Sequence, residues 1–491
     1  MKEQYRFLAI DLGAGSGRVI LGTLSNGKIS LQELHRFETG GITILDTLQW
    51  DYTRIYAEII NGLIKYRQMF GAQLDGIAID TWGVDFGLIA RDGTVLGNPI
   101  HYRDKRTVGI PDLVYRTISP EKLYRETGIQ HLPFNTIFQL YSMVHTRSPI
   151  LAAADSMLLM GDLFAYLLCG KRACEYTNAS TTQLLDLKKK TWNEDLIYGI
   201  GIPRNLLLDI VQPGTVLGPI LPEIAKQTGL DATVPVIAPA SHDTASAIAA
   251  IPVTSSKKNW AYISSGTWSL LGTELDSPII NQDSYQHQFT NEAGVDNKIC
   301  FLKNISGLWL VQECRNYWNR QSTVTDYAKL TQEAESAAPL QAIIDVNDSK
   351  LLAPENMPEM IQQLCREIRL RRIPETKGEI IRCALESLAY QYKQRIQDLD
   401  TILGRKTELL HIVGGGVQNR LLSQLASDAC GIPVIAGPVE ATTIGNIIVQ
   451  AIALGGIKSL AAARQIIAQS FEVTRFEPKN TEAWKKLVIS S

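Results

Sequence analysis

The stretch IDLGAGSGR, from Ile10 to Arg18, lies within the longer segment FLAIDLGAGSGRVILGTL, Phe7 to Leu24, and this segment decides the fold class. Its second half, Arg18 to Leu24, is short and rich in β-branched residues, which favours a strand over a helix. The segment therefore predicts a strand, a glycine turn and a second strand. Similar apolar runs at Gly76 to Ala90 and Leu409 to Asn419 alternate with helical patterns, which is typical of an α/β protein.

A second hairpin of the same kind is predicted about 250 residues later. The segment YISSGTWSLLGT, Tyr262 to Thr273, again joins two strand-like runs through small residues and ends in Leu-Gly-Thr. Two hairpins can share glycines by chance, so this likeness alone leaves internal duplication open. The polar, turn-forming segment IPVTSSKKN, Ile251 to Asn259, predicts a boundary near residue 250, with domains at 1–250 and 251–491.

Composition and charge exclude several functions. The 491 residues carry 48 Lys and Arg against 50 Asp and Glu, a net charge of -2, and 45% are hydrophobic. Proteins that hold nucleic acid or an anionic membrane through charge have basic patches, so we expect no nucleic-acid partner and no membrane partner. The charge-free run Ala441 to Ile457 falls short of the roughly 20 apolar residues of a membrane span and predicts a buried helix.

The cysteines and the first residues of the chain indicate the cellular compartment of the protein. Seven cysteines without a CxxC pair indicate reduced thiols, and the start MKEQYRF lacks the pattern of a signal peptide. We therefore expect a cytoplasmic protein.

The first glycine loop is predicted to bind phosphate. A dinucleotide fingerprint that begins at Gly13 would need its last glycine where Arg18 stands, and it would need a helix after the loop, whereas a strand is predicted here. No GK[ST] of a Walker loop follows either. A hairpin of glycines and serine can still present backbone N–H groups to phosphate oxygens, and Arg18 adds a permanent positive charge. Because a carboxylate beside phosphates needs a cation, Asp11 predicts a Mg²⁺ site, unless these residues only build a tight turn.

The segment PASHDTASAIAAI, Pro239 to Ile251, offers a candidate catalytic base. Asp243 falls in the first turn of a predicted helix of small residues. In one interpretation Ser241 caps the helix and Asp243 only complements its dipole. In the other, Asp243 accepts the proton of a substrate hydroxyl during phosphoryl transfer, with His242 and Thr244 beside it.

Two further motifs each allow two interpretations. IDTWGVDFGLI, Ile79 to Ile89, is either core or part of a sugar site in which Trp82 and Gly83 approach a ring. The glycines of HIVGGGVQNR, His411 to Arg420, either lie against a purine base or permit a tight strand-to-helix turn.

Other catalytic classes are excluded by spacing. There is no HExxH metal motif and no GxSxG elbow. The string HYRDKR, His101 to Arg106, is not a protein-kinase catalytic loop, because Gly109 stands where that loop needs Asn.

The ordered set of motifs resembles the FGGY family of carbohydrate kinases, within the actin-like ATPase superfamily. IDTWGVDFGLI, HYRD, SHDTASA, SSGTWSLLG and VGGGVQN occur in the order and combination of that family along the whole chain. The resemblance implies an α/β fold of two actin-like (ribonuclease H-like) ATPase domains flanking a nucleotide and sugar cleft.

The same resemblance implies a set of site residues. For ATP they are Ala14, Gly15, Ser16, Gly17, Arg18 and Thr267 at the phosphates, with Gln312 and Gly415 completing the nucleotide site and Asp11 holding Mg²⁺ through water. For the sugar they are Gly83, His242, Asp243, Thr244 and Asn304, with Asp243 as the base. Asn304 and Gln312 lie in NISGLWLVQECRNYW, which otherwise reads as a plain amphipathic helix, so these two rest on the resemblance alone.

The implied reaction is transfer of the γ-phosphoryl group of MgATP to O1 of L-rhamnulose, giving L-rhamnulose 1-phosphate and ADP. The alternatives are a kinase of the same family that acts on xylulose, fuculose or glycerol, and an actin-like ATPase module without sugar chemistry. The base-bearing SHDTASA segment favours a kinase, because a module that only couples nucleotide state to partner binding needs no such base.

Overall fold

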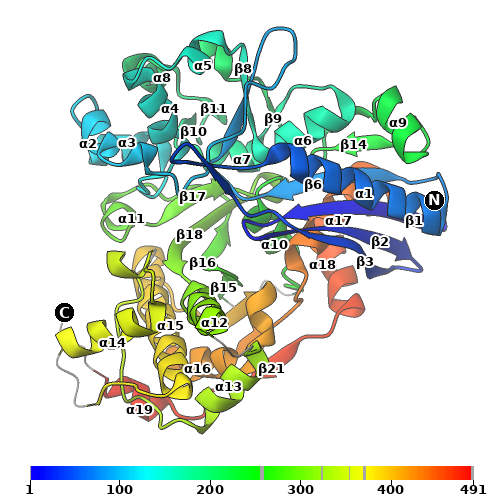
Figure 1. Ribbon diagram of the computed structural model, residues 1–491. Helices are drawn as coiled ribbons and strands as arrows, with labels where there is room; N and C mark the ends of the chain where they lie inside the picture. The colour runs from blue at the N-terminus through cyan, green and yellow to red at the C-terminus, as the bar shows by residue number, and fades with distance from the viewer. Residues whose placement is uncertain (1, 255–258, 322–324, 353, 369–371, 488–491) are drawn as a thin grey trace. The chain divides into compact units, whose positions relative to one another are not determined.

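The chain folds into two compact units that exchange segments along the sequence. The computed structural model describes residues 2–254, 259–321, 325–352, 354–368 and 372–487 (Figure 1). The first unit comprises Met1–Thr254, Glu274–Phe301 and Ala441–Ser470, and the second comprises Ser255–Thr273, Leu302–Glu440 and Phe471–Ser491. Part of the segment predicted to form the boundary, residues 255–258, lies outside the described residues.

The first unit is built on a six-stranded sheet with the order β13-β14-β6-β1-β2-β3 (Figure 1). The predicted glycine hairpin is confirmed: β1 (Gln4–Leu12) and β2 (Ser16–Ser25) pair antiparallel through the glycine turn. Strand β6 (Gly76–Thr81) runs parallel to β1 on its other side, and β14 (Pro235–Ile237) runs parallel to β6. The sheet is completed by β3 (Lys28–Glu38) and β13 (Val216–Pro219). The ends of β1 and β6 and the beginning of β2 therefore lie side by side at the same end of the sheet's strands.

Two helices cover opposite faces of this sheet. Gly62 of α1 (Tyr52–Phe70) lies against Val19 of β2, while Gly22, three residues further along β2, lies against Ile447 of α17 (Ala441–Ala453). Successive side chains of a strand point to alternate faces, so positions three apart face opposite sides. The long charge-free run is thus the buried helix that the sequence predicts.

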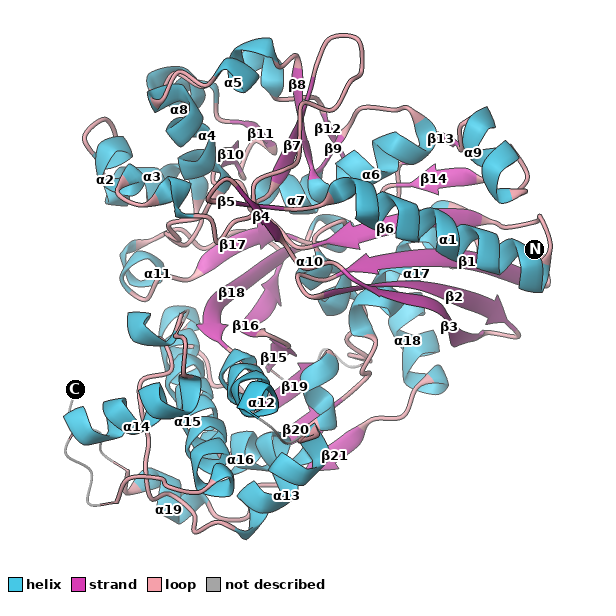
Figure 2. Cartoon of the chain, viewed as in Figure 1, coloured by secondary structure: helices cyan, strands magenta, loops and turns pink. Residues whose placement is uncertain are grey.

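The second unit repeats the topology of the first. Its hairpin is also confirmed, with β15 (Trp260–Ser265) antiparallel to β16 (Trp268–Leu275). Strand β19 (Leu409–Val413) runs parallel to β15, and β20 (Val434–Ala436) runs parallel to β19 (Figure 2). In each unit, two further strands therefore continue the sheet beside the first strand of the hairpin, each parallel to its neighbour: β6 and β14 beside β1, and β19 and β20 beside β15. This shared order favours duplication, which the short sequence likeness left open.

Helices cover the second sheet and smaller elements complete both units. Helix α15 (Lys377–Leu403) begins with a capping box, in which Thr376 and Glu379 each bond the backbone N–H of the other. The other elements of the second unit are α12 (Trp309–Gln321), α13 (Tyr327–Ser336), α14 (Met357–Glu367), α16 (Arg420–Cys430), β21 (Thr474–Phe476) and α19 (Thr481–Lys485), with β18 (Ile299–Ser306) contributing residues to both units. Those of the first unit are β4 (Ile42–Ile44), β5 (Thr47–Gln49), β7 (Phe86–Ile89), α2 (Ile110–Tyr115), α3 (Pro120–Thr127), α4 (Thr136–His145), α5 (Pro149–Ala153), β8 (Ser156–Leu159), α6 (Met160–Cys169), β9 (Cys174–Glu175), α7 (Tyr176–Ser180), β10 (Leu185–Asp186), β11 (Thr191–Trp192), α8 (Glu194–Gly199), β12 (Ile210–Val211), α9 (Pro222–Thr228), α10 (Asp243–Ala249), α11 (Gln282–Gln286), β17 (Thr290–Ala293) and α18 (Leu460–Ser470). Among the described residues, no helix combines the length and the hydrophobicity that a membrane crossing requires.

Candidate active site

The turn of the first hairpin exposes backbone at the end of the sheet. Gly13 donates its N–H to the carbonyl oxygen of Ser16 at 3.0 Å, which closes the turn, and Gly15 and Ser16 are exposed at its tip. A Cβ on Gly15 would meet nothing within 4 Å, whereas a Cβ on Gly17 would lie 2.5 Å from the ring of Phe37. Gly17 is therefore required by packing, while Ala14, Gly15 and Ser16 form the open part of the loop.

Asp11 and Arg18 face each other across this hairpin. They are register partners on β1 and β2, and Nη2 of Arg18 donates to Oδ2 of Asp11 at 2.5 Å. The hydroxyl of Thr443, at the start of α17, donates to the same oxygen at 3.0 Å. The predicted phosphate-binding arginine and the predicted metal-binding acid thus form one ion pair.

A second acid lies beside Asp11 on the neighbouring strand. Asp80 is the register partner of Asp11 on β6, is fully buried, and accepts a hydrogen bond at Oδ2 from the side chain of Asn446 at 2.6 Å. Its other oxygen, Oδ1, has no hydrogen-bond partner among the described residues. Burial, followed by the charge of Asp11, raises the pKa of Asp80 well above its ordinary value.

These two acids suit a cation that keeps its own water. No group of three or more His, Cys, Asp or Glu side chains in the described part of the chain is arranged to hold a metal directly. Mg²⁺ commonly retains several waters and takes only one or two carboxylates beside substrate phosphates. Asp11, with the unsatisfied oxygen of Asp80 beside it, therefore fits the water-mediated Mg²⁺ site predicted from the sequence.

Asp243 occupies the first turn of α10, as the sequence predicts. The side chain of Asp243 is 35% exposed, and Oδ1 accepts a hydrogen bond from the hydroxyl of Thr244 at 3.1 Å. Nε2 of His242 lies 3.5 Å from the same oxygen. Burial raises the pKa of Asp243 and the charge of Asp11 adds to this, while His242 and Thr244 act in the opposite direction. A carboxylate that is accessible yet strongly influenced by its neighbours is suited to accept a proton.

The interpretation of Ser241 as the cap of α10 is wrong. His242 occupies the N-cap position and makes no side-chain cap hydrogen bond. Ser241 instead donates both its N–H and its hydroxyl to Oε2 of Glu175, at 3.1 and 2.7 Å. Glu175 is fully buried and caps α7 by accepting from the N–H groups of Thr177 and Asn178. A single carboxylate therefore fixes the loop before α10 to the start of α7.

The other end of α10 is also held. Nε and Nη2 of Arg464 donate to the carbonyl oxygens of Ala249 and Ile248, at 3.3 and 3.2 Å, in the last turn of the helix. The same guanidinium forms two hydrogen bonds with Glu274, at 2.9 and 2.8 Å. Both ends of the helix that carries Asp243 are thus fixed by buried charged groups.

Gly83 lies in the tight connection from β6 to β7. A Cβ there would lie 3.0 Å from the side chain of Thr181, so the chain passes too closely for most side chains. The next acid, Asp85, is fully buried and accepts from Nε1 of both Trp50 and Trp82, at 2.7 and 3.1 Å. Trp82 is only 6% exposed, so most of its ring is core.

The remaining predicted residues belong to the second unit. Thr267 lies in the turn from β15 to β16, and its hydroxyl donates to Oε1 of Gln312 on α12 at 3.1 Å. Gly415 is exposed in the short 3-10 helix Gly415–Gln418 that follows β19, and a Cβ on its neighbour Gly416 would lie 2.0 Å from Oγ of Ser265. The close approach explains why glycines stand here. Asn304 lies on β18 and is half-buried, so this segment is a strand at Asn304 and becomes helix α12 only from Trp309.

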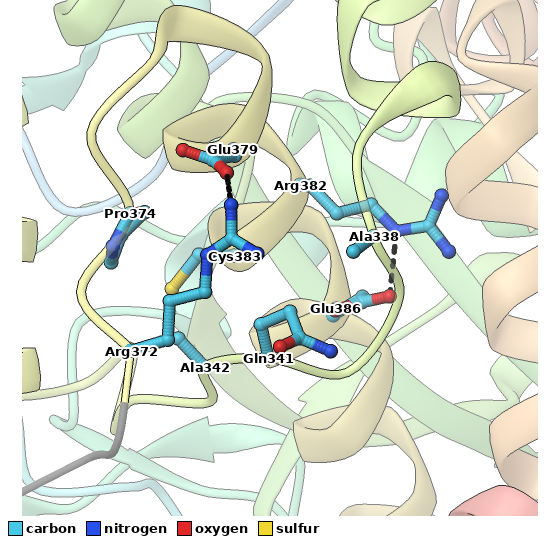
Figure 3. Close-up of a pocket in the computed structure, with 9 residues that line it drawn as sticks. All are labelled: Ala338, Gln341, Ala342, Arg372, Pro374, Glu379, Arg382, Cys383 and Glu386. Atoms are coloured by element: carbon cyan, nitrogen blue, oxygen red, sulfur yellow. Dashed lines mark hydrogen bonds and ion pairs between the residues drawn. The ribbon is translucent and has the colours of Figure 1, made fainter.

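A hollow on the second unit is separate from these residues. It is formed by α15 and the segments before it, and is lined by Ala338, Gln341, Ala342, Arg372, Pro374, Glu379, Arg382, Cys383 and Glu386 (Figure 3). Arg372 is paired with Glu379, and Arg382 is paired with Glu386. None of the predicted site residues lines the hollow, so we assign it no part in the chemistry.

Several contacts to the site residues were missed from the sequence. Thr443 and Asn446, on α17, bond the two acids at the ends of β1 and β6. Glu292, on β17, lies with Oε2 3.3 Å from Nδ1 of His242. These residues stand in unremarkable helix and strand patterns, so no local signal marks them.

The chain matches the two models of a single protein family. The model described as FGGY family of carbohydrate kinases, N-terminal domain, matches residues 6–250, and the corresponding C-terminal domain model matches residues 261–454.

Three curated proteins that are similar to this chain along nearly its whole length are named rhamnulokinases. A rhamnulokinase from Bacteroides thetaiotaomicron is 42% identical over 98% of this chain and 98% of that protein. A rhamnulokinase from Enterococcus faecalis is 44% identical over 96% and 93%, respectively, and one from Bacillus subtilis is 39% identical over 97% and 96%.

Solved structures with the same fold are more distant in sequence. A xylulose kinase from Lactobacillus acidophilus superposes with a TM-score of 0.79 at 18% identity, covering 98% of this chain and 96% of that one. A glycerol kinase from Plasmodium falciparum superposes with a TM-score of 0.75 at 16% identity, with the same coverage. At these identities the likeness shows the fold alone.

Proposed function

The chain belongs to the FGGY family of carbohydrate kinases, and from this premise we propose that it phosphorylates L-rhamnulose at O1 with ATP, giving L-rhamnulose 1-phosphate and ADP. The observation that carries the proposal is the 39 to 44% identity, over nearly the full length, to curated proteins named rhamnulokinases. Other members of the family act on different sugars and polyols, so the substrate rests on this likeness, while the chemistry rests on the site.

Asp243 is assigned as the general base. Its accessible carboxylate at the start of α10 accepts the proton of the O1 hydroxyl as that oxygen attacks the γ-phosphorus. Gly83, His242, Thr244 and Asn304 are assigned to the sugar. Because α10 is fixed at both ends, by Glu175 through Ser241 and by Arg464, the base keeps its position without the sugar.

The nucleotide is assigned to both hairpins and to the glycine turn after β19. Ala14 to Arg18 and Thr267 bind phosphate oxygens through backbone N–H groups and the Arg18 guanidinium, and Gln312 and Gly415 complete the site. Asp11 holds Mg²⁺ through water, with Asp80 beside it. Mg²⁺ neutralises charge on the phosphates when it is bound. Catalysis in this scheme comes from positioning and electrostatics, since phosphoryl transfer needs little covalent work from the protein.

We place two functional domains at 1–250 and 251–491, in line with the two family models, with sugar and phosphate contacts mainly in the first and nucleotide contacts in the second. We place the reaction in the cytoplasm, where ATP is available and where the seven cysteines would stay as the free thiols that the structure contains.

The proposal is tested by a substrate panel. The full chain is assayed for ADP release with MgATP and L-rhamnulose, D-xylulose, L-fuculose or glycerol, and the position of the new phosphate is read by NMR. We expect the highest kcat/KM with L-rhamnulose and the phosphate on O1. The variant Asp243→Asn, purified in parallel, controls for contaminating kinases.

Two results would contradict the proposal. A clear preference for another substrate of the panel would keep the kinase chemistry but overturn the substrate. Slow ATP hydrolysis that no sugar accelerates would overturn the kinase itself and favour an ATPase module.

A further inference from the structure

A buried glutamate holds the ring of His242 from the side opposite Asp243. Oε2 of Glu292, on β17, lies 3.3 Å from Nδ1 of His242, and the two side chains are only 8 and 9% exposed. Nε2, the other ring nitrogen, lies 3.5 Å from Oδ1 of Asp243. Glu292, His242 and Asp243 thus form a line that ends at the assigned base.

Neither end of the first contact has another hydrogen-bond partner. Nδ1 of His242 and Oε2 of Glu292 are fully enclosed, and among the described residues no further group bonds either atom. A buried carboxylate without a compensating positive charge is costly. The pair is therefore stable when the imidazole is protonated.

The other groups around His242 support this charge state. Burial alone opposes a charged ring, but Glu292, Asp243 and Glu175 outweigh it, and together they raise the pKa of His242 above its ordinary value. The backbone N–H of His242 donates to the hydroxyl of Thr177, which fixes the main chain. Cys300 also lies near Glu292, and burial raises its pKa well above its ordinary value, so it stays a neutral thiol.

We propose that Glu292 is a positioning residue for the transfer reaction, holding a protonated His242 with Nε2 directed at the carboxylate of Asp243. The proposal rests on the proposed function, since it gives the line of groups a task in that reaction. Burial and the charge of Asp11 both favour a protonated, inactive Asp243, and His242 is the positive charge that opposes them. Glu292 thereby keeps the base ionised although acids surround it.

The test removes the negative charge of Glu292 and keeps the shape of its side chain. In Glu292→Gln the pKa of His242 should fall by at least one unit, because its strongest anionic partner is gone. A neutral His242 no longer opposes the acids around Asp243, so the pKa of Asp243 should rise and the acidic limb of kcat/KM should move to higher pH. We expect kcat with L-rhamnulose to fall at least tenfold at pH 7 and KM for ATP to change less than twofold.

Two measurements separate positioning from a merely structural role. NMR of the full chain with ¹³C-labelled histidine reports the titration of His242, assigned by the signal that His242→Gln lacks. Glu386→Gln, which removes another buried glutamate, one paired with Arg382, is the matched control and should leave the His242 titration unchanged. Glu292→Asp, which keeps the charge, should restore most of the His242 pKa.

An unchanged His242 pKa and an unchanged pH profile in folded Glu292→Gln would overturn the proposal. If that variant does not fold, the wild-type titration decides, since a His242 pKa below 6.5 would also overturn it. If the wild type phosphorylates no ketose, the proposed function fails on that ground, while the histidine titration still decides whether Glu292 holds His242 in its charged form.

Discussion

Arg18 donates from Nη2 to Oδ2 of Asp11 at 2.5 Å, so the cation and the anion at the tip of the first hairpin neutralise each other. The two side chains are 19 and 8% exposed, which weakens screening by water and salt. Because Arg18 is register-paired with Asp11, the hairpin itself sets this distance. A divalent cation that takes the charge of Asp11 would free the guanidinium for a phosphate oxygen.

Loss of the Arg18 charge should weaken ATP binding. Hydrogen bonds to charged groups contribute about 1.5 to 3 kcal/mol, so Arg18→Met should raise the Kd for MgATP by roughly 10- to 100-fold. Arg36→Met is the matched control, because Arg36 is the partner of Arg18 on β3 and pairs with the exposed Glu33. Calorimetric titration measures the Kd for MgATP of both variants. Equal affinities in the two variants would show that Arg18 does not bind the phosphates.

Asp243→Asn should abolish most turnover without affecting nucleotide binding. A positioned general base contributes roughly 100- to 10,000-fold to a rate, and the amide cannot accept the proton. We expect kcat with L-rhamnulose to fall within that range while the Kd for MgATP changes little. Steady-state kinetics and calorimetry test this together, and a rate that stays near wild type would exclude Asp243 as the base.

Gly445 should not tolerate a side chain. A Cβ at Gly445 on α17 would lie 1.8 Å from the carbonyl oxygen of Ser246 on α10, so the helices would have to move apart. Overpacking of this kind costs about 1 to 3 kcal/mol, and Gly445→Ala should lower the free energy of unfolding by that amount and reduce kcat, since α10 carries Asp243. In Gly199→Ala, where a Cβ meets nothing within 4 Å, stability should hold or rise slightly. Urea denaturation of both variants decides the point.

Asp85 should make stability depend on pH. Burial raises its pKa to about 6 from the ordinary 3.8, although Trp50, Gln139 and Arg106 oppose the shift. The folded protein therefore binds this proton more tightly than the unfolded chain, and the resulting stability is fully present below about pH 3.8 and lost as the pH rises through about 6.

Asp85→Asn removes that dependence. We expect the difference in unfolding free energy, wild type minus variant, to fall by about 2 kcal/mol from pH 4.5 to 7.5, as measured by urea titration at each pH. A difference that is constant across this range would show that Asp85 is ionised throughout.

Much of the local structure could be predicted from the sequence. Both hairpins, the buried helix α17 and the position of Asp243 at the start of α10 follow from patterns within a few residues: glycines at a turn, β-branched runs, a charge-free helix, a helix of small residues. The interpretation of Ser241 as the cap of α10 follows from the preference for serine before a helix, and it is wrong because Glu175 binds that serine here.

The sequence by itself determined the fold class and the family, because the glycine hairpins and the ordered motifs mark them. The same motifs contain the residues assigned to binding and catalysis except Asn304 and Gln312, which rest on the family resemblance alone. The tertiary structure decided which distant groups surround those residues. Thr443 bonds Asp11 across 432 positions and Asn446 bonds Asp80 across 366, while Glu292, on β17, lies 3.3 Å from His242, at the start of α10. Buried polar groups must be paired, but any element that packs against them can supply the partner. The sequence pattern of that element does not predict which buried group it will bond.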